Sequence, residues 1–533
     1  MRKYLNSGLA VVLMVVVAGC GGSSGQSTSS KTASSAQYSE LRVGTTNFPG
    51  AINYTVNAWG TAVSIESLAV QGLIEVGPNY ELRPLLASSI EHPNPTTYIY
   101  NIRSGVRFSN GKLLTAEDVA FSLRQNISAP EALWKPFYED VASIATRGAA
   151  VVVRLKKPDA IWPVVLAASD QIVEQAQVEK VGEQKLGTPN ALPIGTGPWK
   201  FDSYAPEVSV QLSRNPYWHG PPQSARNVTI TLFKSESAME LAMRSGGIDA
   251  AYGFESQREF GAIPNAHLEA GPEIMDDFLS VNVASAPFND IHVRRAVAYA
   301  IDTHGITKAL FSGKGAAPGG PTIISPAGFS DFPSSQVSAM EAALPKYSYD
   351  LAAAKRELAK SAYPHGFSTE VMAATSEPLL VTGAQIVAAD LAKIGIAAKV
   401  RPITPTEYAD LYGKKIKVLL TETAPGFADP DGTLPSLVSA AFIRPPGDGV
   451  NVAEFSTPEV AKLLVEEQGE AASEARRLQM LGKIFKIVNT EAAYLQLLTH
   501  SFFLSLSNKF VASRWSLYSD LYTPWAMNIR PAH

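Results

Sequence analysis

The stretch 97-TYIYNIRSGVRFSNGKLLTAEDVAFSLR-124 decides the fold class, because it combines a strand, turns and a helix in one short unit. Apolar residues alternate with polar ones at its start, which is the period of a half-buried β-strand: Tyr98, Tyr100 and Ile102. A second short strand is expected around its Phe, followed by a glycine turn. Thr115 can then cap a helix over 115–126, and Asp118 lies three residues on, where a carboxylate favours the helix start.

The rest of the chain repeats this mixture of strands and helices. Further strands are expected where apolar residues alternate: Val208, Val210 and Leu212, then Val228, Ile230 and Leu232. A helix is expected at 290–302, with Asp290 as its cap and with Arg294 and Arg295 facing outward or sideways; another at 378–396 opens with Pro. We find no repeat of fixed period, so the fold class is α/β or mixed α and β.

Composition and charge set the size and the partners of the molecule. The chain has 533 residues, 46% of them hydrophobic, which is more than one compact core usually holds and implies two or three lobes. Charged residues make up 18% of the chain and the net charge is −4, so there is no general basic field to attract nucleic acid. We therefore expect no nucleic-acid partner.

The N-terminus has the layout of a secretory signal. Arg2 and Lys3 precede a short apolar stretch, and 17-VAGC-20 resembles the lipobox of bacterial lipoproteins, in which the leader is cut before a Cys that then carries lipid. This predicts a signal peptide at 1–19, lipidation at Cys20, and an anchor on the outer face of a membrane. Residues 20–37 are rich in Gly and Ser and are expected to be a flexible tether.

Motifs for catalysis and metal binding are missing from the sequence. There is no HExxH among the eight His, no GxSxG, and the single Cys is Cys20. His500 is interpreted as a structural residue, and the pairs Asp276–Asp277 and Asp429–Asp431 as caps or solvated turns. We therefore expect no enzyme activity, no cofactor and no metal site.

The opening stretch closely resembles the signature of the family 5 extracellular solute-binding proteins, the oligopeptide, dipeptide and nickel group that serves ABC importers. Three further blocks are similar to this family and keep its order: 194-IGTGPWKF-201 with 214-RNPYWHGPP-222, then 287-PFNDIHVRRAVAYAID-302, then 348-SYDLAAAKRELAKSAYPHGF-367. The resemblance implies a bilobed clamp of the periplasmic-binding-protein type II fold, with an extra sub-domain inserted in the first lobe.

The same resemblance implies domain boundaries and a mode of action. Lobe I is expected to comprise 38–65, 194–272 and 499–533, the inserted sub-domain 66–193, and lobe II 273–498. Segments crossing near 272 and 498 would act as a hinge. A ligand that touches both lobes binds the closed form better and so selects it.

The loop 421-TETAPGFADPDG-432 carries the resemblance to the ligand-binding loop of peptide-binding members. There, an Asp three residues before the acidic residue of an Asp/Glu-Pro pair holds the ligand's α-amine. Asp429 and Pro430 match the pair here, which puts Gly426 at the place of the amine-binding Asp, and Glu422 is a possible substitute. A neutral or anionic ligand, or a blocked peptide, is therefore competitive with a free peptide. The full set of expected contact residues is Asn47, Phe48, Trp59, Glu422, Gly426, Phe427, Asp429 and Tyr494.

The expected function is that of a lipid-anchored substrate-binding protein of an ABC importer. It would act as a monomer that captures a peptide or another small solute and delivers it to the permease subunits in the membrane. The alternative is the same fold without transport, as a scaffold or regulatory lipoprotein of the cell envelope.

Overall fold

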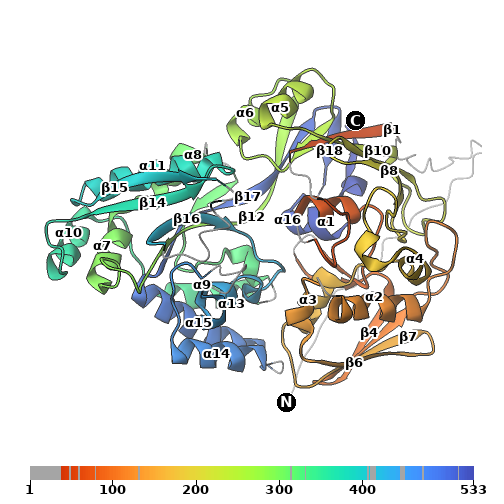
Figure 1. Ribbon diagram of the computed structural model, residues 1–533, viewed down its shortest axis with the longest axis horizontal. Helices are drawn as coiled ribbons and strands as arrows, with labels where there is room; N and C mark the ends of the chain where they lie inside the picture. The colour runs from red at the N-terminus through yellow and green to blue at the C-terminus, as the bar shows by residue number, and fades with distance from the viewer. Residues whose placement is uncertain are drawn as a thin grey trace, which may run out of the picture. The chain divides into compact units, whose positions relative to one another are not determined.

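The computed structural model describes residues 38–46, 50–57, 60–77, 80–129, 132–311, 315–330, 332–404, 407, 416–443, 451–470, 473–513 and 515–532 (Figure 1). The predicted leader and tether, together with Cys20, Asn47, Phe48 and Trp59, lie outside these residues. The chain divides into two compact units, Met1–Ala36 and Gln37–His533, and the fold below is that of the second. No helix among the described residues is both long and apolar enough to cross a membrane.

One large sheet organises the Gln37–His533 unit. Eleven of the described strands belong to it, ten of them in the order β15 (Ala397–Ile403), β14 (Ser368–Ala374), β16 (Val418–Thr423), β12 (Ala266–Val281), β17 (Tyr494–Ser507), β11 (Ala250–Tyr252), β1 (Tyr38–Thr45), β10 (Ala225–Leu232), β9 (Ser209–Arg214) and β8 (Trp199–Ala205). The eleventh, β13 (Ala316–Pro318), pairs with β17. We use the name lobe I for the part around β1, β10 and β11, and lobe II for the part around β14, β15 and β16.

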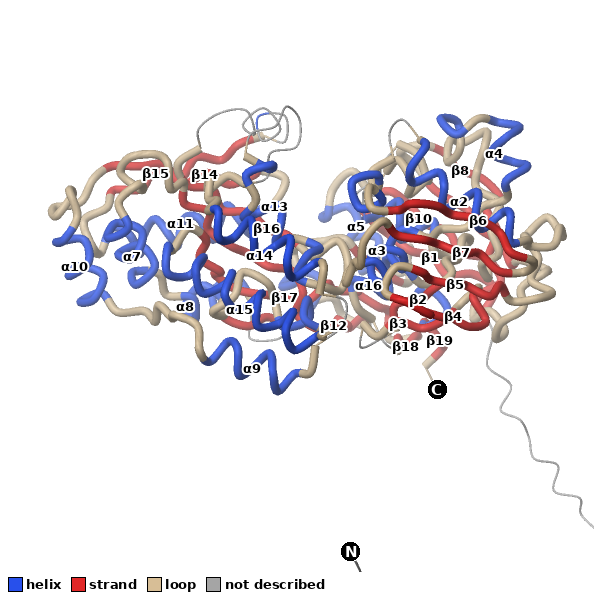
Figure 2. The backbone as a smooth tube through the Cα atoms, turned by 90° about the horizontal axis from the view of Figure 1, so that it is seen from below, coloured by secondary structure: helices blue, strands red, loops and turns tan. Residues whose placement is uncertain are grey.

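Two long antiparallel strands, β12 and β17, join the lobes (Figure 2). Their register shifts between Ala270 and Glu273, then again before Met275 and after Asp277. Gly271 and Pro272 lie at the first irregularity, where proline has no N–H to donate to the ladder. A side chain at position 271 would also collide with the carbonyl oxygen of Trp515, 2.6 Å from the place of a Cβ. The crossing is therefore the part of the sheet with the least regular pairing, as a hinge requires.

The parallel strands of both lobes end at this crossing. β1 runs parallel to β10 and β11 in lobe I, and β14 runs parallel to β15 and β16 in lobe II. β11 is antiparallel to β17, and its chain runs toward lobe II from Ala250 to Tyr252. β16 is antiparallel to β12, and its chain runs toward lobe I and ends at Thr423. The carboxyl ends of the two parallel sets therefore face each other across β12 and β17.

Helices cover both faces of the sheet in lobe II (Figure 1). Leu279 and Val281 of β12 pack in the core of α7 (Ile291–Ala300), α8 (Thr303–Leu310) and α11 (Pro378–Ala392), and α10 (Leu351–Lys360) packs against α7. Phe278, directly before Leu279, points into the core of α9 (Ser334–Ala342), α13 (Leu434–Val438), α14 (Pro458–Gln468) and α15 (Glu474–Glu491), because successive strand residues face opposite sides.

The two helices predicted for this lobe are present. Asp290 caps α7 by accepting a hydrogen bond from the His292 N–H at 2.8 Å, and α11 begins at Pro378. The prediction that Arg294 faces outward or sideways is wrong. Its guanidinium is buried and bonds the Phe288 carbonyl at 2.9 Å and the Glu491 carboxylate at 2.7 Å, because the end of α15 packs against α7.

Lobe I has an aromatic core between its strands and its terminal segments. Trp199, Tyr252, Trp515 and Trp525 are buried there together. The remaining elements of this part are α1 (Gly60–Glu66), α5 (Glu236–Arg244), α6 (Gln257–Gly261), β18 (Phe510–Ala512), α16 (Leu517–Tyr522) and β19 (Ile529–Pro531). The C-terminal segment therefore returns to the core in which the described chain begins.

The opening stretch of the sequence lies in a separate four-stranded sheet. Its order is β4 (Ala87–Asn94), β5 (Thr97–Ile102), β7 (Ala150–Leu155) and β6 (Val141–Arg147), with β2 (Ile74–Val76) and β3 (Leu82–Pro84) as a small second sheet. The helices beside it are α2 (Ala116–Ser128), α3 (Trp162–Ser169) and α4 (Gln175–Val181).

The predicted strand and helix of the opening stretch are β5 and α2. Thr115 and Asp118 form a reciprocal capping box at the start of α2. The expected second strand is reduced to one bridge between Arg107 and Leu113.

Candidate functional site

The convergence of strand ends at the crossing is where a ligand site is expected, because loops at the carboxyl ends of parallel strands present side chains and free backbone groups. Lobe I contributes the loop after β11, with Glu255. Lobe II contributes the loop after β14, with Glu377, and the loop after β16, which begins at Ala424. β12 and β17 form the floor between them.

A cluster of two carboxylates and one imidazole lies on this floor. Asp277 of β12 and Glu422 of β16 are directly opposite in the ladder, so their side chains lie on the same face. His500 of β17 places Nε2 2.7 Å from Glu422 Oε2 and 3.8 Å from Asp277 Oδ1. Asp277 and His500 are buried, and Glu422 is partly exposed. The cluster is thus open to solvent on the Glu422 side.

The electrostatics of the cluster are dominated by burial and by the attraction between His500 and the two carboxylates. Burial raises the pKa of Asp277 well above its usual range, and His500 opposes this rise. Burial disfavours the charged form of His500, but Glu422 and Asp277 outweigh it and raise the pKa of this imidazole to about 9. At neutral pH His500 therefore carries a proton and forms an ion pair with Glu422.

Two further carboxylates surround the cluster from opposite lobes. Glu255 accepts a long hydrogen bond from the Leu379 N–H of α11 at 3.4 Å, so it spans from lobe I to lobe II. Burial raises the pKa of Glu255 to about 9, with a further contribution from Glu422. Burial likewise raises the pKa of Glu377, which directly precedes α11, to about 7. This end of the site is therefore rich in acidic groups that hold protons near neutral pH.

The loop after β16 is held rigidly from behind by a buried arginine. Asp429 caps the short 3₁₀ helix Pro430–Gly432 by accepting a hydrogen bond from the Asp431 N–H at 2.9 Å. Arg477 of α15 binds both oxygens of Asp429, at 2.5 and 2.6 Å, and donates to Glu467 at 2.8 Å. Asp429 is fully buried, so its side chain braces the loop.

The tip of the same loop contacts lobe I. Tyr518 of α16 donates a hydrogen bond to the Pro425 carbonyl at 2.8 Å, and Tyr522 donates to the Gly426 carbonyl at 2.7 Å. Phe427 is buried and packs edge-on against Phe137, with ring centroids 5.7 Å apart. The described conformation therefore has the lobes in direct contact on this side of the floor.

Gly426 has room for a side chain. A Cβ built at this position meets the Gly432 carbonyl oxygen at 3.6 Å, an ordinary contact, as its nearest neighbour. Its backbone φ lies outside the left-handed region that favours glycine. The absence of a carboxylate here is thus a property of the sequence and is not imposed by the backbone.

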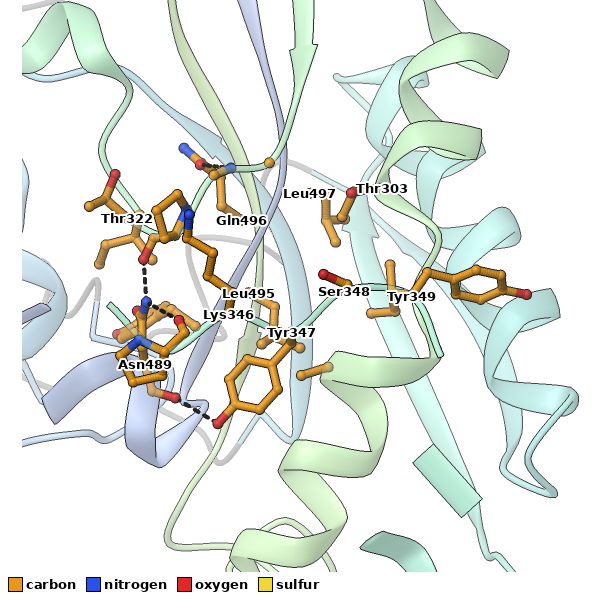
Figure 3. A pocket seen from close by; sticks show the side chains of 18 of the residues that line it. Thr303, Thr322, Lys346, Tyr347, Ser348, Tyr349, Asn489, Leu495, Gln496 and Leu497 are labelled. Atoms are coloured by element: carbon orange, nitrogen blue, oxygen red, sulfur yellow. Dashed lines mark hydrogen bonds between the residues drawn. The ribbon is translucent and has the colours of Figure 1, made fainter. Parts of the chain in front are cut away.

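Tyr494 is buried in the core of lobe II with Phe278 and Leu437. Its hydroxyl donates to the Leu437 carbonyl at 2.6 Å and is 3.0 Å from Asn451 Oδ1. It lines a cavity of about 340 Å³ inside lobe II, whose wall also includes Tyr347, Asn489 and Gln496 (Figure 3). Gln496 in this wall donates a hydrogen bond through its side-chain amide to Asp276, the neighbour of Asp277 in β12, at 2.8 Å.

Four of the predicted contact residues lie in this arrangement, and their contact with a ligand stays a prediction. Glu422 lies in the cluster, Gly426 and Phe427 lie at the lobe contact, and Asp429 lies behind them. The interpretation of Asp276 and Asp277 as caps or solvated turns is wrong, because both lie in β12 and are buried. Glu255 and Glu377 were missed. The available signal was their position three residues after the end of a short apolar strand, where the carboxyl ends of parallel strands collect.

Comparison with known proteins gives a consistent family and fold. The model of the bacterial extracellular solute-binding proteins, family 5, middle region, matches residues 81–443. Heme-binding protein A of Haemophilus influenzae is 27% identical over 457 residues, covering 78% of this chain and 78% of that protein. The glutathione-binding protein GsiB of Escherichia coli is 26% identical over 343 residues, covering 62% of this chain and 63% of that protein.

Solved structures are similar over nearly the whole chain. The substrate-binding protein CtaP of Listeria monocytogenes superposes with a TM-score of 0.80 at 18% identity, covering 93% of this chain and 100% of that chain. DppA of Helicobacter pylori, in complex with the peptide STSA, superposes with a TM-score of 0.74 at 21% identity, covering 93% and 99%. The predicted fold, a bilobed clamp of the type II periplasmic binding proteins, is confirmed.

Proposed function

The chain belongs to family 5 of the bacterial extracellular solute-binding proteins, and from this premise we propose that it is the lipid-anchored substrate-binding component of an ABC importer. It captures a peptide or another small solute between its lobes and delivers it to the permease subunits in the membrane. It binds its ligand and does not transform it. Relatives are named for heme, glutathione and di- or tripeptides, which sets the range of solutes to test.

The observation that carries this proposal is the meeting of both parallel strand sets over the irregular crossing of β12 and β17. Hydrogen bonds join the lobes on both sides of this crossing, from Glu255 to the start of α11 on one side and from Tyr518 and Tyr522 to the loop after β16 on the other, and the proposed place of the solute is the space between the lobes here. A solute in this space touches both lobes and stabilises the closed form through its differential affinity.

Anchoring and domain division are parts of the same proposal. Cys20, in the sequence VAGC, is the residue we expect to carry lipid, after removal of 1–19, with 20–37 as the tether. The boundaries of lobe I at 38–65, 194–272 and 499–533, the inserted sub-domain at 66–193 and lobe II at 273–498 stay predictions. They are supported by the four-stranded sheet, all of whose strands fall within 66–193.

The contact residues also stay predictions, and the structure supplies reasons to rank them. Gly426 and Phe427 belong to a loop tip that reaches lobe I, and Glu422 is partly exposed at the cluster. Asp429 and Tyr494 are better explained as supports, because their polar atoms bond within lobe II. Asn47, Phe48 and Trp59 lie outside the described residues.

A ligand screen with a conformational readout tests the proposal. Peptides, peptide conjugates, opines and sugars are added to the purified chain, and the melting temperature is recorded; a solute at 100 times its Kd stabilises the native state by about 2.7 kcal/mol. The same solute should reduce the radius of gyration in small-angle X-ray scattering, because the lobes close. A solute that raises the melting temperature without compaction contradicts capture by domain closure.

The anchor is tested separately by mass spectrometry of the N-terminal peptide from the membrane fraction. A diacylated Cys20 is expected, and Cys20→Ala should release the protein from the membrane. An unmodified Cys20 in the mature protein contradicts the lipid anchor while leaving the solute-binding proposal intact.

A further inference from the structure

We propose that Asp277, Glu422 and His500 form a binding site for a divalent transition-metal ion at the floor between the lobes. This inference rests on the proposed function and deepens it, because it names a metal ion as ligand, or as part of the ligand, of the same site. The sequence alone gave no such indication, since the three residues are far apart in the chain and belong to three strands, β12, β16 and β17.

The geometry of the three side chains suits one ion. One ligand atom from each residue can be chosen so that all three lie within 4.8 Å of one another. Ligand atoms around a tetrahedral Zn²⁺, with bonds of about 2.0–2.1 Å, lie about 3.4 Å apart. The separation between His500 and Glu422 is 2.7 Å and that between His500 and Asp277 is 3.8 Å, so side-chain adjustments below about 1 Å reach this value for both.

Asp277 supplies an independent sign that something belongs in this place. Its side chain is 3% exposed, and Oδ1 has no hydrogen-bond partner among the described residues. A buried carboxylate oxygen without a partner is costly to the folded chain. The only cationic group recorded beside it in that part of the chain is His500, whose Nε2 lies at 3.8 Å, beyond hydrogen-bonding distance. A cation between Asp277 and Glu422 would satisfy this oxygen.

His500 is oriented as a metal-binding histidine usually is. Its Nδ1 lies 3.0 Å from the Ser501 carbonyl oxygen and donates a proton there, whereas Nε2 points toward the two carboxylates and would release its own proton on binding an ion. Phe311 stacks on the ring at 4.9 Å and fixes its plane. One imidazole nitrogen and two carboxylate oxygens suit a borderline ion such as Zn²⁺, whereas Ca²⁺ prefers oxygen ligands alone.

Two further carboxyl groups, Glu255 and Glu377, lie close enough to Glu422 to interact with it electrostatically. Three protein ligands leave a fourth position open for water or for a group of a bound solute. Glu255, from lobe I, bonds the start of α11 in lobe II and stands at the edge of the cluster, so an ion here attracts carboxylates from both lobes. Metal binding should therefore favour the closed form.

The test is isothermal titration of the purified full-length chain, stripped with EDTA, with ZnCl₂. One Zn²⁺ per chain is expected, with no heat from CaCl₂ at the same concentration. His500→Gln and Glu422→Gln should each weaken Zn²⁺ binding at least about ten-fold. Absorption bands of Co²⁺ in the visible range, present for the unaltered chain, should be lost in His500→Gln. Glu422→Gln guards against misfolding of the buried-histidine variant, because Glu422 is partly exposed.

A matched control exists on the same long strand. His267 lies 3.2 Å from Glu269 in a partly exposed pair on β12, so His267→Gln removes a similar His–Glu contact outside the cluster. This variant should bind Zn²⁺ like the unaltered chain. Equal losses in His267→Gln and His500→Gln, or no Zn²⁺ binding at all, overturn the metal site. If solutes still raise the melting temperature in that case, the proposed function stands without it.

Discussion

Replacing Arg477 should loosen lobe II at the loop that presents Gly426 to lobe I. The guanidinium makes two bonds to Asp429, at 2.5 and 2.6 Å, and one to Glu467 at 2.8 Å, all in a buried setting. Arg477→Met keeps much of the apolar stem but leaves Asp429 buried without a cation. Breaking a buried ion pair from one side costs about 3–5 kcal/mol. Two charged hydrogen bonds, at about 1.5–3 kcal/mol each, give a loss of about 3–6 kcal/mol at Asp429, which overlaps this range.

Arg477→Lys separates charge from geometry. Lysine keeps the positive charge but cannot bind both oxygens of Asp429 with a planar fork, so we expect the loss of one charged bond, about 1.5–3 kcal/mol. The neighbouring Arg476 is the control. Its side chain is 68% exposed and lies 3.5 Å from Glu470, so Arg476→Met should change stability by less than about 0.5 kcal/mol.

Urea unfolding followed by two probes locates the effect. All seven Trp lie outside 273–498, so Trp fluorescence reports on the rest of the chain, whereas far-UV circular dichroism also detects the helices of lobe II. Arg477→Met should lower the midpoint of the circular dichroism transition more than that of the fluorescence transition. Faster hydrogen exchange at 424–432 should accompany it. A change of less than about 1 kcal/mol in Arg477→Met would refute the bracing role.

Three further outcomes follow from the same structure. The double variant Tyr518→Phe, Tyr522→Phe removes two hydrogen bonds between the lobes, each of which stabilises the closed form by about 0.5–1.5 kcal/mol. The fraction of closed molecules, measured by single-molecule energy transfer between the lobes, should therefore fall. An unchanged distribution of transfer efficiencies contradicts the role of these tyrosines in closure. Gly426→Asp should leave stability nearly unchanged, because a Cβ fits at this position. It should strengthen the binding of peptides with a free amine about ten-fold or more, because one charged hydrogen bond contributes about 1.5–3 kcal/mol. Amine-acetylated peptides are the control, and an unaltered chain that already requires a free amine contradicts this prediction. Burial raises the pKa of Asp520 to about 8, against about 4 in the unfolded chain, so its contribution to stability is complete below pH 4 and is lost as the pH rises to 8. Asp520→Asn keeps an acceptor for the Ser64 hydroxyl. The melting temperature of this variant should therefore depend less on pH, and the variant should be more stable than the unaltered chain at pH 8.5. Equal dependence of the two melting temperatures on pH would contradict the raised pKa of Asp520.

Local patterns predicted the elements that depend on neighbours in the chain. β5 and α2 follow from alternation and a capping box within the opening stretch, and α7 and α11 follow from helical periodicity with Asp290 or Pro378 at the start. These features are readable because strands and helices repeat at short, fixed spacings. The outward or sideways placement of Arg294 failed, because the carbonyl and carboxylate that receive it come partly from the distant end of α15.

The sequence by itself determined the class of the molecule, its family blocks and the loop in which Gly426 replaces an expected acid, and it predicted a leader over 1–19 before Cys20. Only the tertiary structure decided the chemistry of the floor. Asp277, Glu422 and His500 come together because antiparallel pairing places β12 between β16 and β17 and sets their register, and Glu255 joins them from the other lobe. Strand register and burial decide which carboxylates are solvated and which are buried without a partner. Both arise from contacts between segments that are distant in the sequence, so local sequence patterns do not reveal them.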